Sequence, residues 1–376
     1  MNVVHVFPYT PKISGGHSNA IRGFIACQRA KGINAVGVAP KASNLSTEQD
    51  WGFPLAEVGS LWELRWKAIA ERFGFNAGNS LLNFYSINYR FTPLLKDLRH
   101  AGVPYVLTEQ GQLAFQNAAR WLKKFIYLNC LDWGPRRAAG LHVLTRKVAE
   151  GLKYMLPGYR GRVLVQGNLI SLPGPGQMAA SARSTYGIPE ESFVLLYLGR
   201  LDIPVKGLDC VVEAFSQLPS ERFHLIMAGP DWHGGQAKLE NLAKRLGCLE
   251  RLHFLGPLFG DKKWALLRMA DVFVSPSRKE GFSLSHAEAL CCGLPLLTST
   301  KINLAPELRE ADAAFLVPPA ARPLAEAMKK LEAEPQLRAN LGRRGQAWFQ
   351  ANCDPDQAGE LFREFYQGIL ENRHKC

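Results

Sequence analysis

Residues 277–295 read SRKEGFSLSHAEALCCGLP, a stretch in which a turn of small residues separates a predicted strand from a predicted helix. The preceding ADVFVSPS is typical of a buried strand, and the apolar run from Leu284 to Leu290 predicts a helix that ends at Gly293 and Pro295. The chain therefore places free amides and the positive end of a helix dipole directly after a strand. Such an arrangement suits a bound phosphate.

Two glutamates flank this predicted phosphate site, Glu280 before Gly281 and Glu288 within the helix. The amides that would contact the phosphate are those of Phe282, Ser283 and Leu284. The carboxylates would accept hydrogen bonds from hydroxyl groups of the same ligand. An alternative needs no ligand: Ser285 and Glu288 fit the S-x-x-E capping box, and Glu280 would then be an ordinary loop charge.

The pattern E-G-F-S-L-S-x-x-E-A-L-x-x-G-L-P closely resembles the E-x7-E signature of GT-B glycosyltransferases, in particular retaining family 4, the glycosyl transferases group 1. The resemblance implies that Glu280 lies by the donor sugar and that Glu288 holds the ribose of the nucleotide. It also implies an α/β fold of two doubly wound Rossmann-like domains that face a central cleft.

Apolar runs rich in β-formers alternate with helical patterns in both halves of the chain. The first half contains NVVHVF, a helix from about His17 to Lys31, then INAVGVAP, LLNFYSI, PYVLTEQ and LHVLT. The second half contains FVLLYLG, HLIMAG, RLHFLG, DVFVSPS and PLLTS. This alternation predicts two parallel sheets covered by helices on both faces.

The two predicted domains are separated by ISLPGPGQMAASARSTYGIPEES, which is rich in Gly, Pro and Ser, so we place the boundary near residues 168–185. We expect an acceptor-side domain over residues 1–172 and a nucleotide-sugar donor domain over residues 185–356. The resemblance implies that a terminal helix, about residues 357–374, packs back on the first domain.

A second motif, YLGRLDIPVKGLD, opens the second half and contains Arg200 and Lys206. Two cations around a turn can converge on a diphosphate, although bare residues of this kind are more often solvated surface charges. The resemblance favours the diphosphate, because G-R-L-x-x-x-K-G is the donor-diphosphate motif of the family. Residues 199–207 match it with four residues instead of three between Leu201 and Lys206. Both cations would then stabilise the charge that develops on the leaving group.

The first domain offers a weaker pair of signals. PYTPKISGGHSNAIRGF places Gly15 and Gly16 between a strand and a helix, where amides can approach a phosphate closely. The motif resembles the N-terminal glycine loop of the family. In VPYVLTEQGQL the sequence departs from the family, since Gln110 replaces the histidine of many relatives. Gln110 would donate to a sugar hydroxyl or Glu109 would act as an acceptor-side base, and the sequence does not rank them.

No metal and no cofactor is predicted beyond the nucleotide sugar itself. Asp354 and Asp356 have the D-x-D form of metal-dependent transferases of another fold. Asp354 as the N-cap of a helix, with Pro355 as its first residue, explains the same letters better. The eight cysteines include no C-x-x-C pair, so we expect reduced thiols rather than a zinc site or disulfides.

The formal net charge of +12 is uneven: residues 1–170 hold 21 Lys and Arg against 9 Asp and Glu, whereas residues 171–376 hold 24 of each. This asymmetry predicts contact with an anionic membrane surface or a lipid-diphosphate acceptor, and solubility is the alternative explanation. Nucleic acid is not expected, because no motif supports it.

Two aromatic stripes with basic flanks suit either a peripheral membrane helix or a core-facing one. Residues 60–74 space Trp62, Trp66, Ile69 and Phe73 along one predicted helical face, and residues 115–131 repeat the pattern. The sequence shows neither a basic region before its first apolar stretch nor a run of about 18 apolar residues. We therefore expect a cytoplasmic protein, with peripheral contact at the inner face of the membrane as a hypothesis.

The expected function is transfer of a sugar, with retention, from a UDP- or GDP-sugar to a glycan or lipid-linked acceptor in cell-surface polysaccharide synthesis. Three alternatives stay open on the same fold: a nucleotide-sugar epimerase, a sugar-phosphate synthase, or a nucleotide-sugar-binding subunit without activity.

Overall fold

The computed structural model describes residues 1–7, 16–40, 52–60, 62–85, 91–109, 134–170, 183–219 and 222–372. The contacts divide the chain into two compact units. Unit 1 contains Met1–Ile170 together with Cys353–Cys376, and unit 2 contains Ser171–Asn352. The end of the chain therefore belongs to the same unit as its beginning.

The described strands of unit 1 form one parallel seven-stranded sheet, sheet A. Its spatial order is β3 (Leu55–Val58), β2 (Asn34–Pro40), β1 (Asn2–Val6), β4 (Ser80–Phe84), β5 (Tyr105–Thr108), β6 (Gly140–Val143) and β7 (Arg162–Val165). The order reverses direction between β1 and β4, which makes the sheet doubly wound.

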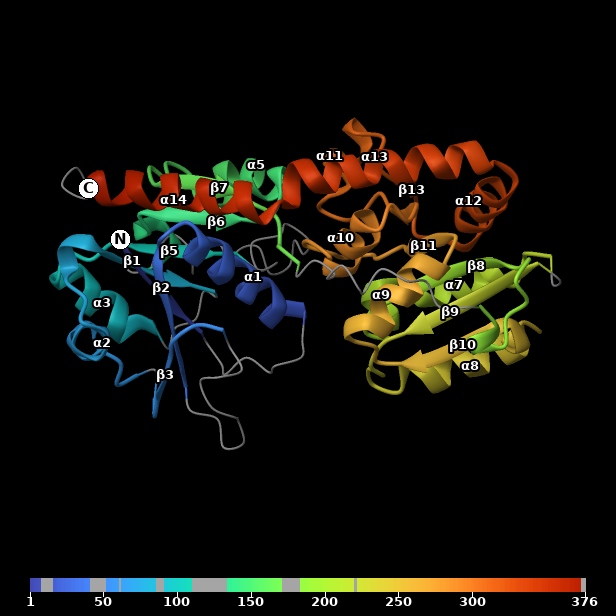
Figure 1. Ribbon diagram of the computed structural model, residues 1–376, viewed down its shortest axis with the longest axis horizontal. Coiled ribbons are helices and arrows are strands. Elements are labelled where there is room, and N and C mark those ends of the chain that lie inside the picture. The colour runs from blue at the N-terminus through green and yellow to red at the C-terminus, as the bar shows by residue number, and fades with distance from the viewer. Residues whose placement is uncertain are drawn as a thin grey trace. The chain divides into compact units, whose positions relative to one another are not determined.

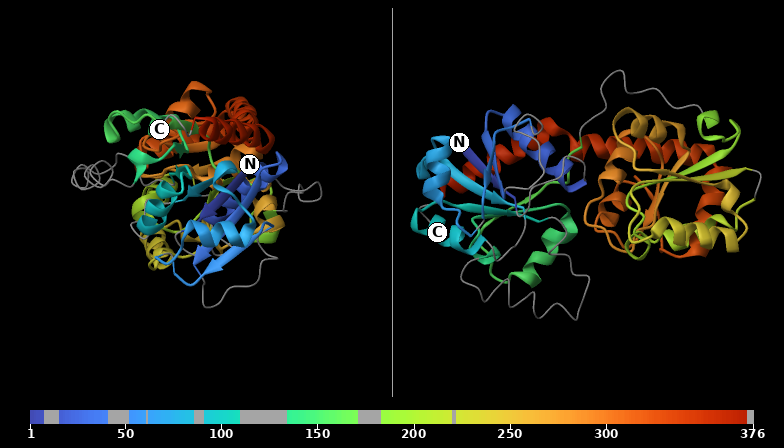
Figure 2. Two further views of the ribbon diagram at one scale, coloured as in Figure 1. Left: turned by 90° about the vertical axis from the view of Figure 1, so that its left-hand side faces the viewer. Right: turned by 90° about the horizontal axis from the view of Figure 1, so that it is seen from below.

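Helices cover both faces of sheet A (Figure 1 and Figure 2). On one face, alternate strand residues such as Val4, Val6 and Leu82 form a core with α2 (Trp66–Phe73), α3 (Thr92–His100) and α5 (Arg146–Met155). On the other face, α1 (Gly16–Ala30) packs against α14 (Pro355–Glu371). The approach is close, because a Cβ added at Gly359 would lie 2.7 Å from the Cys27 carbonyl oxygen.

The sheet face beneath α1 and α14 carries buried polar side chains. The Tyr366 hydroxyl of α14 accepts hydrogen bonds from the Gln28 amide at 3.4 Å and from the Asn83 amide at 3.3 Å. Burial lowers the pKa of His5 to about 3 and that of His142 to about 4, so both imidazoles are neutral at pH 7. Because a buried polar group without a partner is costly, these bonds specify one placement of α14 on the sheet.

The described strands of unit 2 form a parallel six-stranded sheet, sheet B, whose order reverses between β8 and β11. Its spatial order is β10 (Leu252–Gly256), β9 (Phe223–Ala228), β8 (Phe193–Leu198), β11 (Val272–Ser275), β12 (Leu296–Ser299) and β13 (Phe315–Val317). Its helices are α6 (Ile203–Lys206), α7 (Leu208–Phe215), α8 (Gly235–Arg245), α9 (Gly260–Met269), α10 (Leu284–Cys291), α11 (Ala305–Glu310), α12 (Ala321–Ala333) and α13 (Pro335–Cys353). Short 3-10 helices span Ala77–Asn79, Pro135–Arg137, Arg183–Tyr186 and Leu249–Arg251.

Both units are thus Rossmann-like α/β domains, which confirms the predicted fold class. The ten predicted strands are present, and the sheets add β3, β7 and β13 at their edges. None of the helices in the part of the chain that the structure describes is long and apolar enough to cross a membrane.

The predicted aromatic stripe over residues 60–74 is wrong in its first turn. Helix α2 begins at Trp66, after an extended Arg65, and Trp62 lies in the preceding turn with 47% of its surface exposed. Trp66 and Ile69 are buried in the core of unit 1, so these two side chains face the core. The second stripe, residues 115–131, lies outside the described residues.

Candidate active site

The candidate site of unit 2 lies where the strand order of sheet B reverses. Ligands of open α/β sheets bind beyond the carboxyl ends of the strands at this reversal. Two segments leave the sheet here, residues 199–207 after β8 and residues 276–283 after β11. They carry the predicted residues Arg200, Lys206 and Glu280.

Lys206 and Glu280 form an ion pair between Nζ and Oε2, with only 14% and 16% of the two side chains exposed. The Ser277 hydroxyl donates to the same carboxylate oxygen at 3.4 Å. The backbone N–H of Asn303 donates to the Glu280 carbonyl at 3.0 Å. The structure thus brings Lys206 and Glu280 together, and the hydrogen bonds from Ser277 and Asn303 fix the position of Glu280.

Local backbone geometry places Lys206 at the end of α6. Asp202 begins this helix by accepting a hydrogen bond from the Val205 amide at 3.4 Å. The helix ends at Gly207, whose φ of 69° favours glycine. A Cβ added at Gly207 would lie 2.7 Å from the Pro276 carbonyl oxygen, so the two segments are in close contact here.

Helix α10 begins at Leu284 with Ser283 as its N-cap and without a side-chain capping bond. The capping-box alternative for Glu288 is therefore wrong, because Ser285 is the second residue of the helix rather than its N-cap. The Ser285 and Ser283 hydroxyls instead share a hydrogen bond at 3.0 Å. The first-turn amides of α10 have no acceptor within the helix, which leaves this end suited to an anion.

Glu288 points from α10 to α9, where its Oε1 lies 2.7 Å from Lys263 Nζ. The carboxyl is nearly buried, and burial raises its pKa, while the charge of Lys263 and the hydrogen bond from it oppose that rise. Lys263 also lies 4.6 Å from the centroid of the Trp264 ring. Sequence reasoning missed Lys263, since its spacing from Glu288 carries no motif.

Arg200 is exposed, and its guanidinium lies 4.5 Å from the ring centroid of Trp232. It is not a partner of the Lys206 and Glu280 pair. The Tyr197 hydroxyl donates to the Arg200 carbonyl at 2.7 Å. Burial raises the pKa of Tyr197 well above its usual value. The negative charge of Glu280 raises this pKa further and the positive charge of Arg200 lowers it, so both charged groups lie near the hydroxyl.

His286 is a buried neighbour of the pair. Burial lowers its pKa to about 4. The charge of Glu280 raises this pKa and the charge of Lys206 lowers it. Neither ring nitrogen has a hydrogen-bond partner within the described residues. His286 is therefore neutral at pH 7 and adds no charge to the site.

Gly281 and Phe282 connect Glu280 to Ser283, and the Phe282 side chain is buried. The other predicted residues belong to unit 1. Gly16 is the first residue of α1. Gly15 and Gln110 lie outside the described residues. Glu109 is 5% exposed, and its amide donates to the His142 carbonyl at 2.8 Å.

The Asp354-Pro-Asp356 segment is a helix start. The Asp354 carboxylate accepts a hydrogen bond from the backbone N–H of Gln357 at 2.8 Å, and Asp356 pairs with Lys31 at 2.5 Å. Among the residues that the structure describes, no three His, Cys, Asp or Glu side chains group as metal ligands would.

Part of the chain matches a known family. Residues 179–348 match the family model Glycosyl transferases group 1. A D-inositol 3-phosphate glycosyltransferase of Mycobacteroides abscessus is 34% identical over 146 residues, which are 38% of this chain and 32% of that protein. One of Streptomyces avermitilis is 30% identical over 214 residues, 53% and 45% of the two chains. The chain thus spans 32% and 45% of the lengths of these two relatives.

Solved structures resemble the fold over nearly its whole length. Sucrose-phosphate synthase from Thermosynechococcus elongatus has a TM-score of 0.75 at 17% identity and covers 99% of this chain and 100% of its own. HepE of Anabaena, solved in complex with UDP, has a TM-score of 0.79 at 17% identity and covers 98% and 100%. These likenesses establish the GT-B fold. The segment of unit 2 that carries Lys206, Glu280 and Glu288 lies within the residues that match the glycosyl transferases group 1 model.

Proposed function

We propose that the chain is a retaining glycosyltransferase of family 4, which moves a sugar from a UDP- or GDP-sugar to a hydroxyl of a glycan or lipid-linked acceptor. The observation that carries the proposal is the gathering of Lys206, Glu280 and the N-terminus of α10 where sheet B reverses. The family match over the same residues supports it, as does the structure of HepE with UDP-glucose.

Four predicted side chains of unit 2 have roles in this proposal: Arg200, Lys206, Glu280 and Glu288. Lys206 and the first-turn amides of α10 bind the diphosphate, and Arg200 approaches it from the exposed side. Lys206 carries three donor protons, so it can hold Glu280 and a phosphate oxygen together. Glu280 accepts hydrogen bonds from the donor sugar, and Glu288 accepts them from the ribose.

The reaction breaks the bond between the anomeric carbon and the diphosphate oxygen and forms one between that carbon and the acceptor oxygen. The proton of the acceptor hydroxyl passes to the leaving phosphate on the same sugar face, so no protein nucleophile is needed. Negative charge grows on the diphosphate as the bond breaks. Lys206 and the α10 amides oppose that growth, which lowers the barrier.

Unit 1 would present the acceptor. Gly15 and Gly16 would contact the donor phosphates, and Gln110 a sugar hydroxyl. The basic charge of the first 170 residues favours an acceptor that carries phosphate, such as a lipid diphosphate. Such an acceptor fits cell-surface polysaccharide synthesis at the inner face of the membrane. The relatives named for D-inositol 3-phosphate make that compound a second acceptor to assay.

The test uses UDP-glucose and GDP-mannose as donors, with a polyprenyl-diphosphate sugar and D-inositol 3-phosphate as acceptors. We expect transfer by the wild type with an unchanged anomeric configuration, read by NMR. Lys206→Ala and Glu280→Ala should each abolish it, whereas Arg322→Ala, which removes an exposed ion pair of α12, should not. Near-normal transfer by both site variants would remove the site assignment.

Two results would redirect the proposal. Product formed without any acceptor would identify an epimerase or a sugar-phosphate synthase. Nucleotide binding without turnover on any acceptor would identify a binding subunit.

A further inference from the structure

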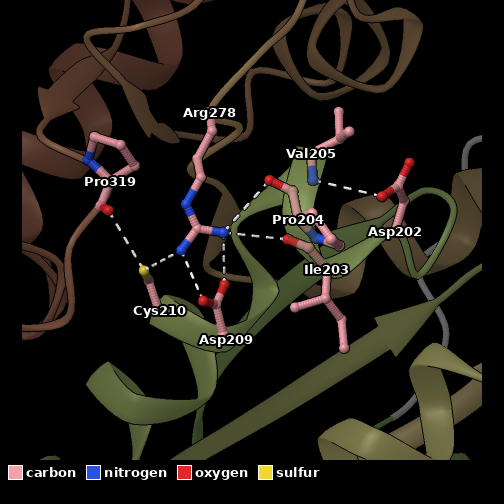
Figure 3. A network of polar contacts seen from close by, with 8 residues as sticks. All are labelled: Asp202, Ile203, Pro204, Val205, Asp209, Cys210, Arg278 and Pro319. Atoms are coloured by element: carbon pink, nitrogen blue, oxygen red, sulfur yellow. Dashed lines mark hydrogen bonds and ion pairs between the residues drawn. The ribbon is translucent and has the colours of Figure 1, made fainter.

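Arg278 joins two elements of unit 2 that meet at the candidate site (Figure 3). Its guanidinium donates to both carboxylate oxygens of Asp209, at 2.9 and 2.7 Å, and to the Cys210 sulfur at 3.0 Å. The Cys210 thiol donates in turn to the Pro319 carbonyl at 3.4 Å. A bidentate pair fixes the plane of the guanidinium, so Arg278 is tied to the first turn of α7.

The same residue also binds the short helix that ends in Lys206. Its guanidinium donates to the Ile203 and Pro204 carbonyls at 3.3 and 3.5 Å. Its backbone amide donates to the Val205 carbonyl at 2.9 Å. Because α6 has only four residues, most of its carbonyls need donors from outside the helix. Arg278 supplies donors to Pro204 and Val205 and adds a second donor to Ile203, whose carbonyl also accepts from the Gly207 amide at 2.9 Å.

Arg278 lies two residues before Glu280, so it connects both members of the ion pair. The Arg278 side chain bonds the segment after β11 to α6 and α7, beside the close contact of Gly207 with Pro276. Arg278 therefore helps to place α6 and the Lys206 ammonium. The Lys279 amide, which donates to the Val205 carbonyl at 3.4 Å, and the packing of Ile203 on the core contribute to the same placement.

We infer that Arg278, held by Asp209, is a positioning residue that places Lys206 for the diphosphate. This inference rests on the proposed function, because it assigns Arg278 an action on the same site. Arg278 acts through Lys206 and does not touch the donor. The effect of removing Arg278 should therefore depend on whether Lys206 is present.

The experiment titrates UDP, GDP and ADP into the full-length wild type by calorimetry and continues with the nucleotide that binds. We expect Arg278→Ala to weaken binding about tenfold in the wild-type background and less than about twofold in the Lys206→Ala background, because coupled residues are not additive. Arg278→Lys keeps the charge but loses the bidentate pair, so its loss should be intermediate.

The matched control is Arg183, which pairs with Asp271 at 3.0 Å just before β11, at the amino ends of the strands. Arg183→Ala removes a comparable Arg and Asp pair from the same unit and should leave the nucleotide affinity unchanged. Thermal unfolding checks that both variants fold.

The outcomes separate the inference from the proposed function. Equal losses for Arg278→Ala in both backgrounds, or a loss no larger than that of Arg183→Ala, would overturn the positioning role and leave the proposed function standing. A wild type that binds none of the three nucleotides would remove the proposed function and the inference with it.

Discussion

Glu288 shows how a residue can be predicted while its partner is not. Its spacing from Glu280 is visible in the sequence, whereas Lys263 lies 25 residues earlier on another helix. Only the packing of α9 beside α10 brings the two side chains together. Arg278 and Asp209 were missed for the same reason. Each flanks a motif without carrying one of its roles, and their contact depends on how α7 meets the segment after β11. Motif spacing predicts groups that bind a ligand, but it does not predict the groups that hold them.

Under the proposal that Glu288 holds the ribose, its pair with Lys263 predicts that nucleotide affinity depends on pH. Burial raises the pKa of Glu288, and the carboxylate must be ionised to accept two hydrogen bonds, so nucleotide affinity should fall as pH drops through that pKa. Lys263→Met removes the positive charge that lowers the pKa of Glu288. The pH at which nucleotide affinity is lost should therefore rise by about one unit or more. Calorimetric titration of UDP or GDP between pH 5 and 8 measures it.

The control for that change is the neighbouring Lys262, which is exposed on α9. Lys262→Met removes a charge of the same kind without touching Glu288, so its affinity profile should match the wild type. Identical profiles for Lys263→Met and the wild type would show that Glu288 does not hold the ribose as an ionised group.

Among the described elements, the central strands were predictable, and of the four edge strands only β10 was predicted. Strands buried on both faces need continuous apolar runs, such as FVLLYL in β8, and such runs are visible in the sequence. β3, β7 and β13 lie at the edges of their sheets and are short. In β7, only Leu164 is buried, so its residues carry no comparable pattern.

Substitution of two glycines in helix α14 tests whether this helix must lie as close to α1 as the structure shows. A Cβ at Gly359 would press on the Cys27 carbonyl at 2.7 Å, and backbone cannot swing aside. At Gly368 of the same helix, the nearest atom is the Arg162 guanidinium at 2.5 Å, the far end of a flexible side chain. Gly359→Ala should therefore destabilise unit 1 by about 1–3 kcal/mol, while Gly368→Ala should change the free energy of unfolding little.

Urea unfolding monitored by hydrogen exchange in α1 and α14 distinguishes the two variants. The expected signature is a selective loss of protection in both helices for Gly359→Ala. Equal behaviour of the two variants would show that α14 has room to shift on the sheet.

Across the whole molecule, charge separates the units. Unit 1 holds 24 Lys and Arg against 14 Asp and Glu, and unit 2 holds 21 against 19. A positive potential over one unit attracts an anionic surface and weakens with salt. The proposal of an acceptor carried by the membrane draws on this difference.

We predict that the protein floats with vesicles that contain phosphatidylglycerol at low salt, and that about 0.5 M salt releases it. Vesicles of phosphatidylcholine alone should not carry it. Lys67→Glu with Arg72→Glu, both exposed on α2, should weaken flotation. The matched pair Lys244→Glu with Arg245→Glu, exposed on α8 of unit 2, should not. Failure to float at low salt would remove the membrane hypothesis.

Because α14 belongs to unit 1, it also determines the order in which the two units are completed during translation. Every strand of sheet B is translated before α14 emerges. Until then, the face of sheet A that receives Phe362 and Tyr366 has no cover from this helix, and Phe24 lacks its ring contact with Phe362. The unit that starts first is therefore finished last, and a ribosome that stalls within unit 2 leaves an incomplete unit 1 behind it.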